Sequence, residues 1–386
     1  AANKKYVDDL SSNVFGIIET LDVENVTKLD ISTNLTVLGH SSLQDTSVNK
    51  LDVSSDLYVS GNLIMDNRNI FSSLDNSINN IEKIFKSVDY IIYGNSWSQL
   101  GSDIDGSVGD SFGFTLSLSS DGTIVAIGGQ LNDTYGTNRG IVKVYQYSNN
   151  SWSQLGSDFN GEANKDRSGQ SVSLSSDGNI VAIGAHENDG NGSNSGHVRV
   201  YQYSNNSWSQ LGSDIDGEAA DDKSGFYLSL SSDGNIVAIG AYINDGNGTD
   251  SGHVRVYQYS NNSWSQLGSD IDGEAASDYS GYSVSLSSDG TIVGIGATLN
   301  DGNGSSSGHV RVYQYSNNSW SQLGSDIDGE AANDQSGFSL SLSDNGTIVA
   351  IGSYGNDGNG TDSGHVRVYQ YSNNSWIQLG SDIDGE

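Results

Sequence analysis

The feature that most constrains this chain is a repeat with a period of 56 residues. Tryptophans recur with this spacing along most of the chain, at Trp152, Trp208, Trp264, Trp320 and Trp376. A further tryptophan, Trp97, lies 55 residues before Trp152. The segment WSQLGSDIDGE that begins at Trp208 returns almost unchanged in the other copies. A fixed period of this size indicates stacked supersecondary units that bury their apolar side chains against their neighbours.

The sequence pattern of one 56-residue unit predicts four short strands. In the copy around Trp208 and Trp264 we expect them at 225–231, 236–241, 253–259 and 264–267. The second strand is a continuous apolar run, IVAIGA, which is typical of burial on both faces. The sequences SSDG and SNNS between strands are signals for tight turns, and tight turns join antiparallel strands.

Four antiparallel strands joined by short turns form the blade of a β-propeller. The predicted fold class is therefore all-β, with tandem four-stranded blades of a β-propeller, about five to six in number, preceded by a small β-shaft and a short helix. A β-solenoid is the alternative, but its strands are parallel. Five complete blades are predicted, at 112–155, 168–211, 225–267, 281–323 and 337–379.

An incomplete blade precedes these five, because residues 90–100 predict only the third and fourth strands of a unit. The sequence after residue 379 stops where a further first strand would begin. Three explanations stay open: the chain is a fragment, a partner supplies the missing strands, or the array stays open. An unpaired strand edge is a template for another chain.

The units resemble FG-GAP repeats, the blades of integrin α-subunit propellers. The residues that carry the resemblance are SGFYLSL at 224–230, IVAIGA at 236–241 and SGHVRVY at 251–257, and the resemblance covers residues 112–379. Two features depart from the family. The chain has no proline, so the family's Gly-Ala-Pro is lost, and a short SSDG turn stands where the family has its calcium loop. The resemblance therefore implies a propeller but not the family's calcium site.

The N-terminal region has a different pattern. The segment 26–39 is echoed 22 residues later at 48–61, which predicts two rungs of a β-shaft. Apolar residues from Phe71 to Val88 keep a/d spacing, which predicts either a coiled-coil neck or one helix packed on the propeller. Residues 1–9 resemble a Lys-Lys-Tyr-Val-Asp segment of phage tail-fibre proteins. We therefore expect a fibre-like assembly region at 1–69, a helix at 70–89 and a propeller at 90–386.

Composition narrows the classes of partner. The net charge is −32, with only 16 Lys and Arg, so binding to nucleic acid or to an anionic membrane surface is not expected. No stretch approaches the roughly 18 apolar residues of a membrane span. The chain has no cysteine, does not begin with Met and has no signal peptide, so we expect a processed chain. The predicted location is extracellular, on a cell surface or on a virion.

The acidic loops are the candidate metal sites. Each copy of Asp-x-Asp-Gly-Glu offers several hard oxygen ligands within five residues, and Ca²⁺ takes six to eight oxygens. The alternative is a solvated loop whose carboxylates bind nearby backbone amides. The predicted calcium ligands are Asp214, Asp216, Glu218, Asp270, Asp272, Glu274, Asp326, Asp328 and Glu330.

Sequons of the form Asn-x-Ser/Thr are frequent, and one recurs at the tip of each predicted hairpin between the third and fourth strands. Such tips are good acceptors if the chain passes through a eukaryotic secretory route. The predicted glycosylation sites are Asn149, Asn205, Asn261, Asn317 and Asn373.

Histidine and arginine also recur in the third strands of four units, as His197 and Arg199, His253 and Arg255, His309 and Arg311, and His365 and Arg367. A residue repeated in every blade is expected to serve the blade, here by stacking on aromatic neighbours. His186 and Glu187 occur in one copy only, with no nucleophile near them in the sequence. Catalysis needs an asymmetric, preorganised site, so the sequence predicts that the chain is not an enzyme.

Two functions are compatible with these patterns. The first is a structural or adhesive protein that self-assembles into a trimeric fibre or a helical filament, with glycans or cell-surface proteins as further partners. The second is a monomeric recognition module, integrin-like or lectin-like, that Ca²⁺ stabilises.

Overall fold

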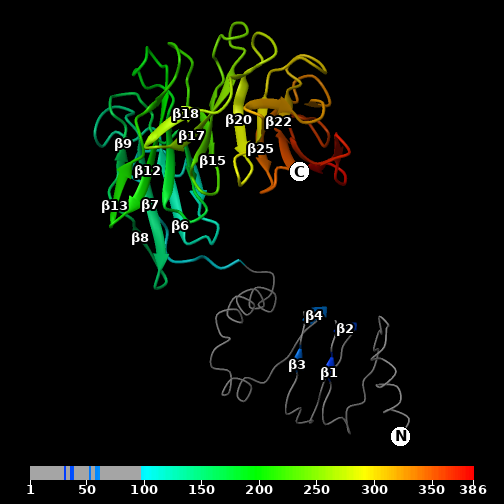
Figure 1. Ribbon diagram of the computed structural model, residues 1–386, viewed down its shortest axis with the longest axis horizontal. Helices are drawn as coiled ribbons and strands as arrows, with labels where there is room; N and C mark the ends of the chain where they lie inside the picture. Colours follow the sequence, from blue (N-terminus) through cyan, green and yellow to red (C-terminus); the bar gives the residue numbers. More distant parts are fainter. Residues whose placement is uncertain (1–29, 32–34, 39–51, 54–56, 61–96) are drawn as a thin grey trace. The chain divides into compact units, whose positions relative to one another are not determined.

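The computed structural model describes residues 97–386 and four short strands before them (Figure 1). Contacts divide the chain into two units, residues 1–98 and residues 99–386. The predicted helix at 70–89 and the predicted strand before Trp97 lie outside the described residues. Residues 97–100, predicted as the fourth strand of an incomplete blade, form no strand, so this prediction is wrong. All regular structure in the described residues is β, which confirms the predicted fold class.

The first unit contains two pairs of parallel strands. β1 pairs with β3, and β2 pairs with β4. Both pairs join residues that are 22 positions apart, as Asp30 with Asp52 and Leu35 with Leu57. The pairing therefore follows the spacing of the two similar sequence segments. The strands are β1 (Asp30–Ile31), β2 (Leu35–Leu38), β3 (Asp52–Val53) and β4 (Leu57–Ser60).

The second unit contains five sheets, which we number blades 1 to 5 in chain order. In each blade four antiparallel strands, a to d, lie in sequential order, and a short strand e also pairs with strand c. Blade 1 has β5 (Thr115–Leu118), β6 (Ile124–Gly129), β7 (Ile141–Ser148), β8 (Ser151–Gln154) and β9 (Phe159–Asn160). Blade 2 has β10 (Ser171–Leu174), β11 (Ile180–Ala185), β12 (His197–Ser204), β13 (Ser207–Gln210) and β14 (Ile215–Asp216).

The remaining blades repeat this order. Blade 3 has β15 (Tyr227–Leu230), β16 (Ile236–Ala241), β17 (His253–Ser260), β18 (Ser263–Gln266) and β19 (Ile271–Asp272). Blade 4 has β20 (Ser280–Leu286), β21 (Ile292–Ala297), β22 (His309–Ser316), β23 (Ser319–Gln322) and β24 (Ile327–Asp328). Blade 5 has β25 (Ser336–Leu342), β26 (Ile348–Ser353), β27 (His365–Ser372), β28 (Ser375–Gln378) and β29 (Ile383–Asp384).

Both tight turns that the sequence predicts are present. In the a–b turn of blade 3, the Gly234 amide donates to the Ser231 carbonyl oxygen at 2.9 Å. In the c–d turn, Asn261 and Asn262 have φ of 52° and 63°. A two-residue hairpin with positive φ at both positions matches the twist of the strands, and asparagine tolerates that conformation. The repeated Asn-Asn pair therefore sets the c–d hairpin.

Strand e was not predicted from the sequence, where its residues read as part of a loop. It forms because strand c has eight residues and strand d has four, so half of strand c would otherwise lack a partner on that side. Ile271 and Asp272 pair with Val254 and His253. The acidic segment is thereby fixed as the outer edge of its own blade.

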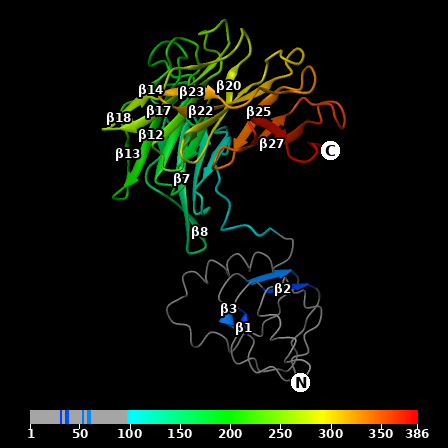
Figure 2. The same ribbon diagram turned by 45° about the vertical axis from the view of Figure 1, so that its right-hand side comes forward.

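The blades follow one another in chain order (Figures 1 and 2), and the apolar core lies between them. Strands b, c and e of one blade supply the first half of each cluster, such as Ile236, Val254 and Ile271 of blade 3. Strands a and b of the next blade supply the second half, such as Leu286 and Val293. Four such clusters join blades 1–2, 2–3, 3–4 and 4–5. Each blade is therefore stabilised by its neighbours in the row.

Candidate functional site

A polar group recurs at successive blades, and we call it the junction group. It consists of a Glu after strand e of one blade and a His, an Arg and an Asp of the next blade. Within residues 97–386 the structure contains four of them: Glu162, His197, Arg199 and Asp214; Glu218, His253, Arg255 and Asp270; Glu274, His309, Arg311 and Asp326; and Glu330, His365, Arg367 and Asp382.

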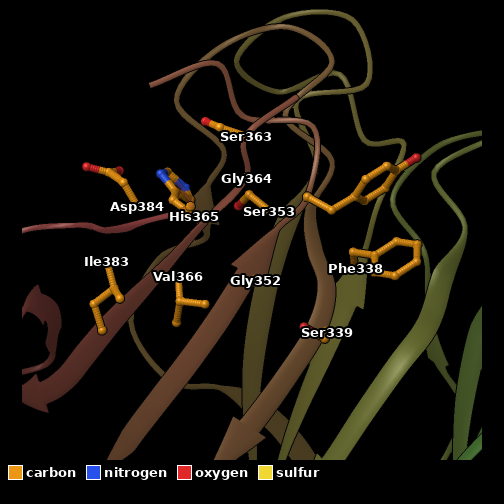
Figure 3. Close-up of a pocket in the computed structure, with 12 residues that line it drawn as sticks. Phe338, Ser339, Gly352, Ser353, Ser363, Gly364, His365, Val366, Ile383 and Asp384 are labelled. Carbon is orange, nitrogen blue, oxygen red and sulfur yellow. The ribbon is translucent and has the colours of Figure 1, made fainter. Parts of the chain in front are cut away.

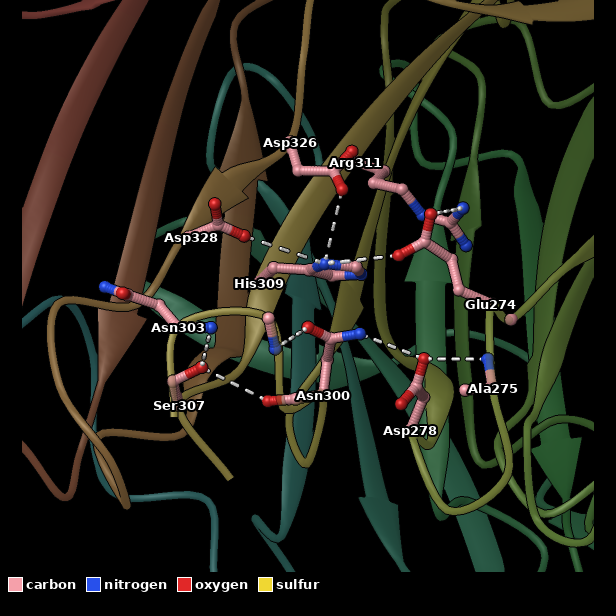
Figure 4. Close-up of polar contacts among 12 residues, drawn as sticks. Glu274, Ala275, Asp278, Asn300, Asn303, Ser307, His309, Arg311, Asp326 and Asp328 are labelled. Carbon is pink, nitrogen blue, oxygen red and sulfur yellow. Dashed lines mark hydrogen bonds and ion pairs between the residues drawn. The ribbon is translucent and has the colours of Figure 1, made fainter. Parts of the chain in front are cut away.

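Figure 4 shows the junction group of blade 4, where the His309 ring faces carboxylates from two blades. Its Nδ1 lies 3.8 Å from Asp326 Oδ2 and 4.0 Å from Glu274 Oε2. The Arg311 guanidinium lies 3.3 Å from the other oxygen of Glu274 and donates to the Asp272 carbonyl oxygen at 2.8 Å. The group therefore ties strand c of blade 4 to strand e and the following loop of blade 3.

In three of the four junction groups, those of His197, His253 and His309, the histidine is a neutral, buried base. The His309 side chain is 1% exposed, and burial, aided by the Arg311 charge, lowers its pKa to about 4. The same causes lower the pKa of His197 and His253 to about 4. Nε2 of each of these three rings is buried and has no hydrogen-bond partner in the described part of the chain. These histidines therefore carry no charge at neutral pH.

The arginine of the group takes the aromatic contact that the sequence led us to expect of the histidine. Arg255 Cζ lies 5.5 Å from the centroid of the Tyr257 ring, two residues along the same strand. A guanidinium over a tyrosine face is favourable. The equivalent pairs in blades 2, 4 and 5 have distances of 5.5–5.9 Å. The histidine is thereby left facing the carboxylates.

The junction group offers one nitrogen and two carboxylates to a metal. In each of the four groups, one ligand atom from the Glu, the His and the Asp lie within 4.8 Å of one another. Zn²⁺ and Mn²⁺ accept imidazole with carboxylate, whereas Ca²⁺ requires six to eight oxygens. The donor set therefore fits a borderline divalent cation better than Ca²⁺. Such an ion would replace the present long contacts, all of 3.6–4.0 Å, between the ring nitrogen and the carboxylates.

The structure divides each predicted calcium segment between two junction groups. Asp214 faces His197 of its own blade, whereas Glu218 faces His253 of the next. Asp216 lies between them, and its backbone carbonyl oxygen accepts a hydrogen bond from Arg255. Burial, together with the charge of Asp214, raises the pKa of the Asp216 carboxyl. The other predicted ligands follow the same division, with Asp270 and Asp326 in their own blades and Glu274 and Glu330 at the next.

The calcium loop of the FG-GAP family has no counterpart in the a–b turn. Here the carboxylate of Asp233 accepts hydrogen bonds from the Ser231 hydroxyl at 2.7 Å and from the Asn235 amide at 3.0 Å. Burial raises the pKa of this carboxyl, but these hydrogen bonds outweigh it, so the net pKa is lowered. The carboxylate thus stabilises its own turn.

All five predicted glycosylation sites lie on the c–d turns, at residues with φ of 50–52° that are exposed to solvent. The first Asn of each turn is the sequon residue, so its side chain is not enclosed by the strands. The sites in question are Asn149, Asn205, Asn261, Asn317 and Asn373.

One polar cluster breaks the repeat symmetry, and its arginine was missed in the sequence. Arg167 Nε lies 3.0 Å from Glu187 Oε2, and His186 Nε2 lies 3.7 Å from Oε1 of the same carboxylate. Burial lowers the pKa of His186 to about 3, and the charges of Lys223 and Arg167 contribute. The His186 ring also meets the edge of Phe226, with centroids 5.2 Å apart.

Blade 5 presents an apolar face on the side away from blade 4. Val366 is 36% exposed and Ile383 is 61% exposed, whereas Val310 and Ile327, their counterparts in blade 4, are 0% and 5% exposed. A hollow of about 350 Å³ lies beside them (Figure 3), lined in part by Phe338, Gly352 and His365. We call this surface the C face.

Blade 1 presents the complementary face on the side away from blade 2. Leu116 and Leu118 of β5 are 63% and 54% exposed. Their counterparts Leu228 and Leu230 in blade 3 are each 7% exposed, because they pack on blade 2. We call this surface the N face. At each internal junction, apolar side chains at the equivalent positions of strand a cover strands b, c and e of the preceding blade.

The comparisons with known proteins bear on the fold. The FG-GAP repeat family matches residues 160–201, which agrees with the resemblance seen in the sequence. No curated protein matches the chain. These comparisons give no support to the likeness of the N-terminal segment to tail-fibre proteins.

Several solved structures are similar to this chain. The periplasmic gluconolactonase of Pseudomonas aeruginosa is 14% identical with a TM-score of 0.47, covering 69% of this chain and 70% of its own. A putative 6-phosphogluconolactonase of Bacteroides uniformis is 13% identical with a TM-score of 0.44, covering 71% and 86%. The hydrazine synthase of Kuenenia stuttgartiensis is 12% identical with a TM-score of 0.46, covering 74% and 69%.

The prediction that this chain is not an enzyme is corrected, because its premise does not hold; two of the similar structures are named as lactonases. The prediction depended on the absence of a polar cluster that breaks the repeat, and the group of Arg167, His186 and Glu187 is such a cluster. At this level of identity the likeness concerns the fold and assigns no activity to the chain.

Among the residues that the structure describes, none forms a helix of the length and apolar character that a bilayer span requires.

Proposed function

We propose that this chain is an extracellular structural protein whose blade rows join head to tail, with the C face of one copy packed on the N face of another. The observation that carries the proposal is the contact between consecutive blades, which recurs four times within residues 97–386 and joins two different surfaces each time. A C face and an N face differ from each other, so their contact is heterologous, and repeated contacts of that kind generate rings or helical filaments.

The hydrogen bonds of the internal junctions also support the proposal. At internal junctions a serine hydroxyl of strand a donates to a glycine carbonyl of the next blade, as Ser283 to Gly337 at 2.7 Å. A second serine accepts from a leucine amide, as Ser285 from Leu342 at 3.0 Å. Ser288 N also donates to the Asp344 carbonyl oxygen at 2.8 Å.

The same atoms are available at the two ends of the row. On the C face, the counterparts are the hydroxyls of Ser339 and Ser341 and the amide of Asp344. On the N face, they are the carbonyl of Gly113, the amide of Leu118 and the carbonyl of Ser120. Contact between copies would therefore pair three donors with three acceptors in the register that internal blades use.

Apolar burial gives the scale of the interaction. Leu116, Leu118, Val366 and Ile383 are 36–63% exposed, so covering what remains of them contributes about 3–6 kcal/mol in total, at about 1.5–3 kcal/mol for a fully exposed side chain. Association costs about 4–15 kcal/mol in lost translation and rotation. The apolar side chains alone therefore reach only the lower end of this cost, so the inter-blade hydrogen bonds decide the affinity.

The test is the mass of the full chain by light scattering over a range of concentrations. The wild type should form oligomers that grow with concentration, and Leu116→Asp or Ile383→Asp should stay monomeric. A mixture of these two variants should stop at dimers, because each retains one working face. Tyr135→Asp is the matched control, since Tyr135 is an exposed aromatic in a loop of blade 1. A wild type that is monomeric throughout would refute the proposal.

A second candidate is a monomeric recognition module stabilised by divalent cations, and the junction groups favour it. Four equivalent groups on one row would bind a repetitive ligand, such as a glycan, at several points. Titration of the monomeric Ile383→Asp variant with Ca²⁺, Mn²⁺ or Zn²⁺ by calorimetry tests it, and saturation near four ions per chain is expected. Absence of heat with all three ions would dismiss it.

A further inference from the structure

A few positions of the repeat carry different kinds of side chain in different blades. The repeats 169–224, 225–280 and 281–336 differ at 11 of their 56 positions. Six of these differences exchange side chains of similar size or polarity, and the other five change the chemical class. The five lie just before or at the start of strand a and directly after strand b. In the repeat 225–280 they are Phe226, Tyr227, Tyr242, Ile243 and Tyr279, and in the repeat 169–224 they are Gln170, Ser171, His186, Glu187 and Lys223. The blade itself is common to these repeats, so it does not explain why the five positions differ.

The differing positions of neighbouring blades meet in space. The Phe226 ring lies 4.6 Å, centroid to centroid, from Tyr242 of its own blade and 5.5 Å from Tyr282 of the next. It also lies 5.2 Å from the His186 ring of the preceding blade. These positions therefore form one continuous surface across blades 2 to 4, which we call the variable surface. Its residues are His186, Glu187, Lys223, Phe226, Tyr242 and Tyr282.

The end of the variable surface in blades 3 and 4 is aromatic. Phe226, Tyr242 and Tyr282 are each partly exposed. Burial and the neighbouring Tyr227 and Tyr242 raise the pKa of Tyr282 to about 12, so its hydroxyl keeps its proton at neutral pH. Neither the Tyr242 hydroxyl nor the Tyr282 hydroxyl forms a hydrogen bond with another residue in the part of the chain that the structure describes. This end thus offers ring faces together with unengaged hydroxyl groups.

The end in blade 2 is polar. The His186 residue is 3% exposed, and its Nε2 lies 3.7 Å from Glu187 Oε1. Its Nδ1 is buried and has no hydrogen-bond partner within residues 97–386. A buried polar atom without a partner costs about 1–3 kcal/mol. The ring lies against Phe226 and within range of the Lys223 charge, and both of these side chains are partly exposed. A ligand hydroxyl placed among them would give the ring the partner that it lacks.

We infer that the variable surface binds a neutral saccharide. The C–H groups on the face of a sugar ring pack on the negative face of an aromatic ring, and its hydroxyls donate to and accept from polar side chains. Phe226 and Tyr242 offer the first kind of contact, and Glu187 and Lys223 offer the second. The inference concerns residues outside the junction groups and does not depend on contact between copies.

Charge selects the neutral class of sugar. The chain has a net charge of −32, which disfavours an acidic sugar. Lys223 and Arg167 lie at the polar end of the surface, where their charges act on His186, and they disfavour a cationic ligand. A polar ring without charge satisfies both conditions.

The repeats themselves supply the test variants. An array of neutral oligosaccharides, printed beside acidic and amino sugars, is first probed with the full chain in the presence of EDTA, so that cations at the junction groups do not contribute. Calorimetry in solution then measures the best-bound neutral saccharide. Phe226→Gln, Tyr242→Thr and Lys223→Gln each introduce the residue that another blade carries at the same position, so the variants should fold, as circular dichroism checks. Each should weaken binding roughly tenfold.

Two matched variants serve as controls. Phe226→Tyr introduces the residue of blade 4, keeps an aromatic ring and should keep most of the affinity. Asn179→Thr also introduces a residue of blade 4, but in the a–b turn, and should bind as the wild type does. Light scattering at the same concentration checks that all chains have the same mass. Lack of binding to every neutral saccharide, a preference for acidic or amino sugars, or equal affinity of Phe226→Gln and wild type would overturn the inference.

Discussion

The indole Nε1 of Trp264 in blade 3 donates to the carbonyl oxygen of Leu211 in blade 2 at 2.7 Å. The indole lies over Gly212, whose φ of 69° turns the chain from strand d toward strand e. A side chain at this glycine would meet both the ring and an unfavourable backbone conformation. The repeated Trp and Leu-Gly of the sequence are therefore the two halves of one contact between blades.

Gly212→Ala should lower the free energy of unfolding by about 2–4 kcal/mol, since it combines collision with the indole and backbone strain. Gly380→Ala is the matched control, because its φ is 77° but no atom lies within 4 Å of the added Cβ. It should cost about 1–2 kcal/mol from the backbone alone. Urea unfolding of the Ile383→Asp background measures both, and equal losses would argue against the indole contact.

Arg255 is expected to stabilise its junction far more than Lys143 stabilises blade 1. Arg255 is buried and donates to the Asp216 carbonyl oxygen at 2.7 Å, so Arg255→Met should cost about 2–3 kcal/mol. Lys143 lies 3.9 Å from Asp158 and is more exposed, so Lys143→Met should change the stability by less than about 1 kcal/mol. Thermal unfolding checks the pair, and an equal effect would contradict the role given to the guanidinium.

Stability should fall as the pH is lowered below about 6.5. The pKa of His309 is about 4 in the folded chain and 6.5 in the unfolded chain, so the unfolded chain binds more protons between these values. The histidine contribution is therefore complete above pH 6.5 and is lost progressively toward pH 4. Glu218, whose pKa is raised by burial, acts in the opposite sense and offsets part of the loss. Melting temperatures from pH 8 to pH 4.5 test this, and a higher melting temperature at pH 5 than at pH 7 would contradict it.

Divalent cations should distinguish the predicted calcium site from the observed donor set. The junction group supplies an imidazole nitrogen with two carboxylates, so Mn²⁺ or Zn²⁺ should raise the melting temperature more than Ca²⁺ does, and EDTA should reverse the effect. Asp270→Asn should reduce the rise, and Asp245→Asn, outside the junction groups, should not. A larger rise with Ca²⁺ would instead favour the oxygen site predicted from the loops.

The sequence was sufficient to predict the strands a to d and both hairpin turns, because these depend on local signals such as Asp233-Gly234 and Asn261-Asn262. Contacts between blades were harder to predict. Asp214 and Glu218 are four residues apart, yet they face histidines of different blades, since strand e lies along the boundary between blades. The role of Arg167 was missed for a different reason, because its partner Glu187 lies 20 positions away and occurs in one copy only.

The restriction of core contacts to consecutive blades has a consequence for how such a chain can evolve. In a closed ring the number of blades is fixed by geometry, so gain or loss of one unit breaks the closure. In a row, duplication of a 56-residue unit inserts one more junction of the same kind and leaves the two terminal faces as they were. Length can then vary between descendants while the surfaces proposed to meet another copy stay compatible.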